Sequence, residues 1–435
     1  MMTKYIGKAM PRYEGLGQVK GQITYVDDIH KPGMVYAKVL RSPVHKGVIR
    51  QLDMSPAENM PGVVGVLTLD DVPGIKTHGK YNDHYVFAPG NIRYKGEPIA
   101  AVVAVDEETA LEAIEKVKLD IEEQEPVFDM FEAIKPGAPL VRPGSTGNLD
   151  EYAPGMTTRI LRLGDVEKGF EEADDIVEGR YVTSTQDHAP IEPHVSVAYI
   201  DEADRLVIHT VSQCMYFLEG MVAAILALPM SRLRYIGGKN GGGFGGKNEL
   251  VCDHVAGLAA LKFRKPVKYR LTRREDLLYT PKRGPFVFEY KTGFKKDGRI
   301  VASHIREWHD TGAYAGMSAY ASEKCGMFVA GPYNIPNILV EAQTIFTNKL
   351  TSSSMRGFAV VNGQAVSEIQ MNKVAQALGM DPWELRFINA WRDGDMGVTQ
   401  YVVDGAGAIE TMKKAAELAG IQLPEHLMAM SSRGR

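Results

Sequence analysis

The feature that most constrains the fold is a glycine-dense segment, residues 237–248, which reads Gly-Gly-Lys-Asn-Gly-Gly-Gly-Phe-Gly-Gly-Lys-Asn. A strand pattern at 233–236 precedes it, and a helix pattern at 249–262 follows it. Glycines let backbone amides approach a ligand closely, and a helix N-terminus adds partial positive charge. The segment therefore predicts a strand, loop and helix unit that cradles an anion or a cofactor phosphate.

The composition is that of a chain with large cores. Its 435 residues are 44% hydrophobic and 24% charged, which predicts two or three domains and excludes disorder, collagen and coiled coil as whole-chain descriptions. The net charge of −4 gives no bulk attraction to nucleic acid or to an anionic membrane. Neither the N-terminal residues nor the apolar stretch 221–228 predicts a signal peptide or a membrane span. The widely spaced Cys214, Cys252 and Cys325 exclude a disulfide framework and favour a reducing, cytoplasmic compartment.

The first third of the chain predicts a compact α+β unit. The run 98–105 is apolar throughout, as a strand covered on both faces should be. Asp106 caps a predicted helix at 107–117. Proline and glycine between 135 and 148 predict a linker, so we place a domain boundary near residue 150, giving domains 1–150 and 151–435. Further strands are predicted at 34–40, 63–69 and 118–122.

After residue 150, the sequence patterns predict fewer strands than helices. Asp381 is the expected N-cap of a helix at 382–391, with Pro382 at its first position. The segment 266–271 alternates like a half-exposed strand. The other elements predicted here are a strand at 206–211 and helices at 217–228, 364–378 and 407–418.

Other interpretations of the charged and glycine-rich motifs are weaker. The segment 241–247 matches the G-x-x-x-x-G-K pattern of a phosphate-binding P-loop, but Asn248 replaces the Ser or Thr that would hold magnesium. A Rossmann interpretation of 241–246 lacks the acidic residue expected about twenty positions later. His188, Glu192 and His194 allow a zinc interpretation, although Pro190 and Pro193 interrupt any helix. The basic run 262–274 is better explained as a solvated strand face than as a nucleic-acid patch.

The glycine segment also resembles the cofactor loop of the molybdenum-binding subunits of the xanthine dehydrogenase family. Upstream, 210–213 (Thr-Val-Ser-Gln) resembles the family's Ser-Thr-Gln segment, and 354–358 (Ser-Met-Arg-Gly-Phe) downstream resembles its Arg-Gly-Phe-Gly segment. The segment 331–337 (Gly-Pro-Tyr-Asn-Ile-Pro-Asn) is also similar, and 93–98 (Arg-Tyr-Lys-Gly-Glu-Pro) is similar to the family's hammerhead domain. The motifs follow the family's order over essentially the whole chain.

The resemblance implies an α+β fold in which an N-terminal α/β hammerhead domain precedes a mixed α/β molybdopterin-binding domain. It implies a molybdenum–molybdopterin cofactor whose metal takes no direct protein ligand. Gln213 matches the glutamine that approaches the metal's apical oxygen and is the implied catalytic residue of this chain. The implied cofactor-binding residues, besides Gln213, are Gly242, Gly243, Phe244, Gly245 and Arg356.

The implied substrate-binding residues are Asn248, Lys324 and Phe358. Phe358 matches an aromatic residue that stacks on a planar substrate. Purine-oxidising relatives have a glutamate at the position of Asn248 and an arginine at that of Lys324, so a substrate other than xanthine is expected. Asn248 suits a hydrogen bond to an amide or ring nitrogen, and Lys324 suits a carboxylate. Ala359 and Asn362 also depart from the family pattern.

The family's reaction is the oxidative hydroxylation of an electron-poor carbon, which predicts an N-heteroaromatic, purine-like or nicotinate-like substrate or, alternatively, an aldehyde. Electrons leave through [2Fe–2S] centres, usually to FAD. The catalytic base is a glutamate in the second half of the family's molybdenum subunit, so we expect it on a partner chain. The chain is thus expected to be the N-terminal half of a split subunit. Its expected partners are the second half, a [2Fe–2S] subunit and an FAD subunit, and its expected cofactor is the cytosine dinucleotide form.

Overall fold

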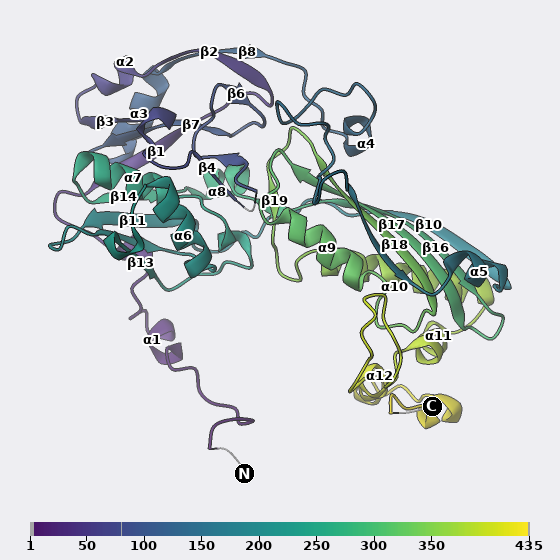
Figure 1. The fold of residues 1–435 in the computed structure, drawn as a ribbon. Coiled ribbons are helices and arrows are strands. Elements are labelled where there is room, and N and C mark those ends of the chain that lie inside the picture. The colour runs from purple at the N-terminus through teal and green to yellow at the C-terminus, as the bar shows by residue number, and fades with distance from the viewer. Residues whose placement is uncertain (1–3, 80, 434–435) are drawn as a thin grey trace.

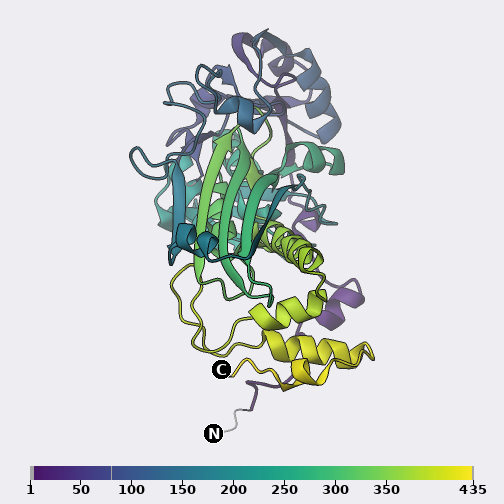
Figure 2. The ribbon, with the colours of Figure 1, turned by 90° about the vertical axis from the view of Figure 1, so that its right-hand side faces the viewer.

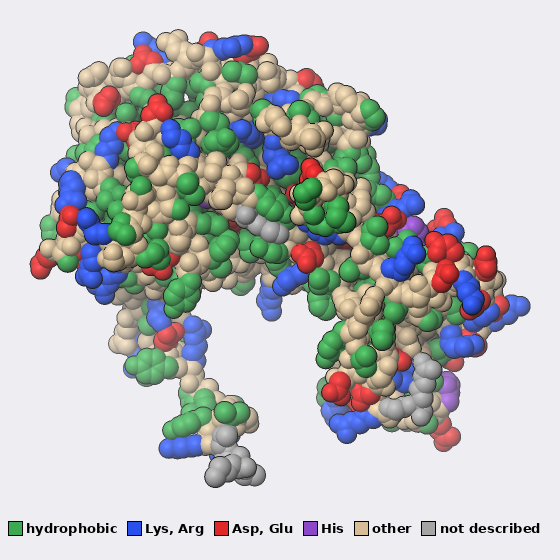
Figure 3. Space-filling view, viewed as in Figure 1, with side chains coloured by type: hydrophobic (Ala, Val, Ile, Leu, Met, Phe, Trp, Pro, Cys, Tyr) green, Lys and Arg blue, Asp and Glu red, His purple; other side chains and the backbone are tan. Residues whose placement is uncertain are grey.

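The computed structural model describes residues 4–79 and 81–433. Two lobes meet at the top of the molecule and diverge below, so that the chain forms an arch (Figure 1). An N-terminal arm containing α1 (Gly15–Val19) extends from the first lobe, and the C-terminal helices extend from the second. The space-filling view shows an open hollow between these two extensions (Figure 3). No helix within the described ranges is long and apolar enough to cross a membrane.

The first lobe is built on a seven-stranded mixed sheet that combines strands from distant parts of the sequence. β1 pairs in parallel with β14, with Val35 opposite Val267. This pairing places strands from both sides of residue 150 in one sheet, and the domain boundary predicted there stays a prediction. The sheet order is β13 (Leu233–Gly237), β12 (Leu206–Thr210), β11 (Val195–Ile200), β14 (Val267–Arg270), β1 (Val35–Arg41), β7 (Pro98–Ala104) and β3 (Val63–Leu67).

Helices cover both faces of this sheet, as the apolar run at 98–105 predicts. Ala101 and Val103 of β7 belong to the core under α7 (Asp253–Phe263) and α6 (Met215–Ile225). The alternate residues of β7 pack against α3 (Glu107–Lys116) on the other face. The predicted cap of α3 is confirmed, because the Asp106 carboxylate accepts a hydrogen bond of 2.7 Å from the Thr109 N–H.

The second lobe contains a five-stranded sheet that the sequence patterns do not predict (Figure 2). α9 (Ser318–Phe328) and α10 (Val360–Leu378) pack against one face, and the short α5 (Val166–Glu171) packs against the strands as well. The central β17 alternates buried and partly exposed residues along most of its length, and its length and partners come from tertiary pairing. The sheet order is β10 (Asp175–Val182), β16 (Phe286–Phe294), β17 (Ile300–Gly312), β18 (Asn337–Phe346) and β9 (Thr158–Leu163).

Smaller elements complete the two lobes. The remaining strands are β2 (Gly47–Asp53), β4 (Thr77–His78), β5 (His84–Tyr85), β6 (Asn91–Ile92), β8 (Lys118–Glu123), β15 (Lys282–Arg283) and β19 (Ser352–Ser353). The remaining helices are α2 (Ser55–Glu58), α4 (Met130–Ala133), α8 (Arg273–Tyr279), α11 (Pro382–Asn389), α12 (Ala408–Leu418) and α13 (Glu425–Ala429). Short 3₁₀ turns occupy Val26–Asp28, Leu69–Asp71, Met230–Arg232 and Gly246–Asn248.

Several predicted boundaries shift for physical reasons. The helix expected from residue 249 begins only at Asp253, because Glu249 is extended and its carboxylate accepts hydrogen bonds from the Met317 N–H and the Ser353 hydroxyl. The helix expected from 364 begins earlier, at Val360. The N-cap predicted for α11 is confirmed, since Asp381 accepts hydrogen bonds from the first turn.

The prediction of a half-exposed strand at 266–271 is wrong. Val267, Lys268 and Tyr269 are all buried, since β14 lies in the middle of the seven-stranded sheet. The Lys268 ammonium instead reaches Asp27, with 3.4 Å between its nitrogen and the carboxylate oxygen. Arg270 pairs with Glu107 at 2.7 Å, so internal ion pairs occupy these basic side chains of the run.

Candidate functional site

Two parallel strands place the main candidate residues at one edge of the seven-stranded sheet. β12 and β13 are neighbours, with Thr210 opposite Gly237. Because parallel strands end at the same edge, Gln213 after β12 and the glycine loop after β13 leave the sheet side by side. The sequence motifs at 210–213 and 237–248 therefore belong to a single site.

Gln213 is hydrogen-bonded to the glycine loop by its backbone and its side chain. The Gln213 N–H donates to the Lys247 carbonyl at 2.8 Å. Its side-chain oxygen accepts from the Gly245 N–H at 2.9 Å and from the Lys247 N–H at 3.3 Å. Since the oxygen is held by the loop, the side-chain NH₂ of this exposed residue is left to donate to a ligand.

The glycines of the loop are required by close packing. A Cβ on Gly243 would lie 2.4 Å from the Gln213 side-chain oxygen, and one on Gly246 would lie 2.9 Å from the His188 ring. Gly245 has a φ of +99°, and a Cβ there would lie 2.8 Å from the Ser354 carbonyl oxygen. The glycines thus let the loop fold tightly against its supports, and the outer surface of the loop is the candidate cradle.

The segment 354–358 lies against the same loop. The Arg356 N–H donates to the Phe244 carbonyl at 2.8 Å. The Ser354 hydroxyl donates to the Gly245 carbonyl at 2.9 Å and accepts from the Asn248 amide at 2.9 Å. Hydrogen bonds therefore bring Gln213, Phe244, Asn248 and Arg356 together, as their motifs predict, although their individual roles stay predictions.

Phe244 and Phe358 both adopt unusual backbone conformations. Their φ angles are +54° and +37°, in a region that non-glycine residues rarely occupy. Strain of this kind persists only where the surroundings enforce it, and it clusters at ligand sites. Phe244 is 47% exposed, so its ring is presented to solvent next to the cradle.

Lys324 and Phe358 form a pair. The Lys324 ammonium, on α9 of the second lobe, lies 5.4 Å from the centre of the Phe358 ring. The Lys324 side chain is exposed, and no carboxylate within residues 4–79 and 81–433 forms an ion pair with it. Phe358 follows Ser354, which bonds to Asn248, by four residues. An aromatic ring with an uncompensated cation over it suits a planar anionic ligand.

The glycine loop is also supported by buried residues that the sequence motifs did not assign to the site. The Lys247 side chain is fully buried and its ammonium lies 2.8 Å from the Glu192 carboxylate. The same Glu192 oxygen accepts from the Gly241 N–H at 2.8 Å. His194 contacts the Gly246 carbonyl at 3.1 Å and the Asp276 carboxylate at 2.8 Å. Their spacing suggested only a metal site, since nothing local to 188–194 reveals which distant loop these side chains will meet.

This geometry contradicts two alternative interpretations. A P-loop lysine must reach a phosphate, but Lys247 is buried against Glu192, and burial lowers the pKa of its ammonium. The zinc interpretation also fails, because His188 bonds to the Ser354 carbonyl at 2.7 Å and the three side chains do not converge. Within the described part of the chain, no group of three or more His, Cys, Asp or Glu side chains is placed to hold a metal ion.

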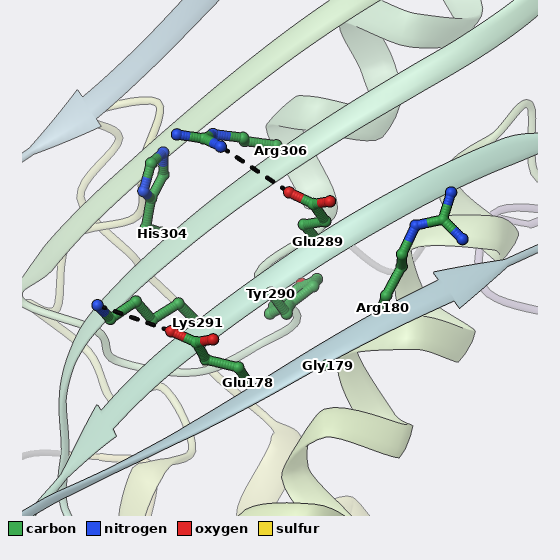
Figure 4. Close-up of a pocket in the computed structure, with 8 residues that line it drawn as sticks. All are labelled: Glu178, Gly179, Arg180, Glu289, Tyr290, Lys291, His304 and Arg306. Atoms are coloured by element: carbon green, nitrogen blue, oxygen red, sulfur yellow. Dashed lines mark ion pairs between the residues drawn. The ribbon is translucent and has the colours of Figure 1, made fainter. Parts of the chain in front are cut away.

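A depression lies on the charged face of the five-stranded sheet in the second lobe (Figure 4). Its charges neutralise one another: Glu178 pairs with Lys291 at 3.7 Å, and Arg306 pairs with Glu289 at 3.8 Å. His304 contacts Glu341 at 2.7 Å. Arg180, which also lines the depression, lies 5.5 Å from the centre of the Phe131 ring. Because the other ions are already paired, the depression is a solvated sheet face and not a convergent ligand site.

Comparison with protein-family models gives two successive matches. Residues 20–125 match the a/b hammerhead domain of aldehyde oxidase and xanthine dehydrogenase. Residues 150–390 match the molybdopterin cofactor-binding domain. The second match contains the glycine loop, Gln213 and the segment 354–358.

Relatives and solved structures agree with these matches. The chain is 35% identical over 416 residues to the nicotinate dehydrogenase large molybdopterin subunit of Eubacterium barkeri, covering 95% of this chain and 96% of that protein. It is 34% identical to a probable xanthine dehydrogenase subunit of Bacillus subtilis (strain 168), over 92% of this chain but 53% of that protein. The aldehyde oxidoreductase of Desulfovibrio gigas superposes with a TM-score of 0.88 at 29% identity, over 94% of this chain and 46% of that chain. The chain thus spans about half of the second relative and of the solved structure.

Proposed function

The chain belongs to the aldehyde oxidase and xanthine dehydrogenase family and is a molybdopterin-dependent oxidoreductase, and we propose that it hydroxylates an anionic N-heteroaromatic substrate together with partner subunits. The observation that carries the proposal is the joint placement of Gln213, the glycine loop and Arg356 at one sheet edge, with the Lys324–Phe358 pair linked to it. The reaction converts a C–H bond and water to a C–OH bond, two protons and two electrons.

The residues present fit a molybdopterin cofactor. Gly243 and Gly245 let the loop pack against the Gln213 side chain and the Ser354 carbonyl, where a Cβ would clash, and the Gln213 NH₂ is left as an amide donor beside the loop. In the proposed site the backbone around Phe244 and the Arg356 segment hold the cofactor, which we take to be the cytosine dinucleotide form. When bound, the cofactor supplies the two-electron oxidant. The chain's own part is to bind it and to orient the substrate ring on Phe358.

We propose that the catalytic base comes from a partner chain. The carboxylates of Glu192 and Glu249, which border the loop, already have partners and are not free to act as a base. Glu192 pairs with Lys247, and Glu249 accepts hydrogen bonds from the Met317 N–H and the Ser353 hydroxyl. Burial also raises the pKa of the Glu249 carboxyl. Exposed apolar side chains surround the loop, with Ile191 at 93% and Tyr216 at 91% exposure. Such a surface is suited to a second polypeptide, which would bring the base, while [2Fe–2S] and FAD subunits take the electrons.

The proposed substrate class follows from charge. Lys324 offers a cation above the Phe358 ring, and the Asn248 side-chain NH₂ has a second N–H besides the one that it donates to the Ser354 hydroxyl. An aromatic ring that carries a carboxylate and a ring nitrogen would satisfy both groups. The name of the Eubacterium barkeri relative supports this choice over an aldehyde.

Metal analysis tests the proposal first. The chain is co-expressed with its companion chains, and molybdenum is measured per mole of intact complex. About one molybdenum atom per chain is expected. An intact complex that contains no molybdenum would contradict the proposal, because the cradle would then serve another purpose.

A dye-linked assay tests the substrate class. With Lys324→Gln, the KM for a pyridine carboxylate is expected to rise about tenfold or more, while the KM for an uncharged N-heterocycle stays the same. Lys373→Gln is the matched control, because Lys373 also lies over an aromatic ring, 4.8 Å from the centre of Tyr181, away from the glycine loop. Equal effects of Lys324→Gln on charged and neutral substrates would contradict the assignment.

A further inference from the structure

β10 is an edge strand whose outer side has free backbone groups. It forms one side of the five-stranded sheet and pairs only with β16 within the described residues (Figure 2). Just beyond the strand, the Thr183 N–H donates to the Phe286 carbonyl at 2.9 Å, which shows that odd-numbered residues face β16. The backbone groups of residues 176, 178, 180 and 182 therefore point away from the sheet.

These outward groups are available for pairing. The Ile176 N–H is bonded to the neighbouring Asp175 carboxylate at 2.7 Å, whereas the described residues supply no acceptor for the N–H groups of Glu178, Arg180 and Val182. A row of unpaired N–H and C=O groups is a template for another strand. Glu178 and Arg180 project from the same side of β10, one on each side of Gly179 (Figure 4).

The side chains on either side of Gly179 allow β10 to pair with a second copy of itself. In an antiparallel pairing of two β10 strands centred on Gly179, Glu178 of one copy lies opposite Arg180 of the other. Ile176, 38% exposed, then lies opposite Val182, 67% exposed. The same register makes each of these even-numbered pairs a hydrogen-bonded pair, so that the charge pattern and the backbone pattern agree.

We propose that β10 is a self-association surface, on which a second copy of this chain adds its own β10 antiparallel about a two-fold axis at Gly179. The pairing joins two five-stranded sheets and forms two Glu178–Arg180 ion pairs. A strand from another protein fits less well, because in β10 each charged residue meets an opposite charge, and each apolar residue meets an apolar residue, when the strand is paired antiparallel with a second copy of itself. Symmetric pairing is also the commonest way in which identical chains associate.

Charge-swap variants test the proposal by analytical ultracentrifugation of the purified full chain over a concentration series. The unaltered chain is expected to show a monomer–dimer equilibrium. Glu178→Arg and Arg180→Glu each place like charges opposite one another at two symmetry-related positions, which should raise the dimer dissociation constant at least about tenfold. The double variant restores opposite charges in reversed order and should restore the dimer.

Two further variants separate edge pairing from general surface charge. Val182→Pro removes an outward N–H without touching the bonds to β16, and should weaken the dimer at an unchanged melting temperature. Arg162→Glu reverses an exposed charge on β9, the opposite edge of the same sheet, and should leave the dissociation constant unchanged. A chain that stays monomeric at its highest soluble concentration would overturn the proposal. So would a dimer that single charge reversals at β10 do not weaken, or that Arg162→Glu weakens equally.

Discussion

Removing the charge of Glu192 should destabilise the first lobe and the cofactor loop together. The Lys247 side chain is 0% exposed and that of Glu192 is 11% exposed, with 2.8 Å between their charged atoms. Glu192→Gln keeps the shape and still accepts from the Gly241 N–H, but it leaves a buried ammonium without a counter-charge. Breaking a buried pair from one side costs about 3–5 kcal/mol. We expect the lower value, about 3 kcal/mol, because the glutamine oxygen still contacts Lys247.

Guanidinium denaturation of the purified chain measures this loss in the free energy of unfolding. The matched control is Glu417→Gln, since Glu417 pairs with Lys414 on the surface, where the side chains are 68% and 60% exposed. Removing that pair should cost less than about 0.5 kcal/mol. In the assembled complex, Glu192→Gln should also lower the molybdenum content per chain, because the loop between Gly241 and Lys247 loses its support.

The double variant Glu192→Gln with Lys247→Met provides the decisive comparison. It removes both charges, so no ammonium remains buried without a partner, and it should be more stable than Glu192→Gln alone. If the double variant is as unstable as the single variant, or if Glu192→Gln costs less than about 1 kcal/mol, the buried ion pair does not hold the loop as argued.

Two further outcomes follow from burial and backbone conformation. Burial lowers the pKa of His78 from 6.5 to about 4, so its contribution to stability is complete above pH 6.5 and is lost as the pH falls toward 4. His78→Gln should make the acid side of the melting-temperature profile less steep. Part of the pH dependence should remain, because burial also lowers the pKa values of His84 and His254, whose rings contact His78. An unchanged acid side would contradict this. Gly245→Ala should destabilise by about 2 kcal/mol or more, because its φ is +99° and the Ser354 carbonyl lies 2.8 Å from the new Cβ. Gly220→Ala, in helix α6 with nothing within 4 Å of its Cβ, should stabilise by about 0.5–1 kcal/mol, and thermal melts compare the two.

Signals that act over a few residues could be interpreted from the sequence. Asp106 and Asp381 cap the helices that follow them, because a short carboxylate side chain meets the first free N–H groups of its own helix. The run 98–105 is apolar on both sides, and the corresponding strand β7 is covered on both faces. The order of the glycine and Arg-Gly-Phe motifs likewise indicated the family, which the matches at 20–125 and 150–390 confirm.

Contacts between residues that are far apart in the sequence could not be predicted from local sequence patterns. The helix pattern at 249–262 does not reveal that Glu249 stays extended to meet Met317 and Ser353. The spacing of residues in 188–194 does not reveal that Glu192 reaches Lys247, so a loop support looked like a metal site. Each of these contacts joins residues more than fifty positions apart, where local propensity carries no information.

The sequence by itself determined the local elements of this protein, its family and the segments that carry the cofactor loop. Only the tertiary structure decided that β1 lies beside β14, that β12 and β13 bring Gln213 to the glycine loop, and that β10 is left at an edge. The physical reason is the distance along the chain over which each interaction acts. Caps, turns and apolar periods act between neighbours in the chain, whereas burial of a charge and strand pairing depend on which distant segments the packed core brings together.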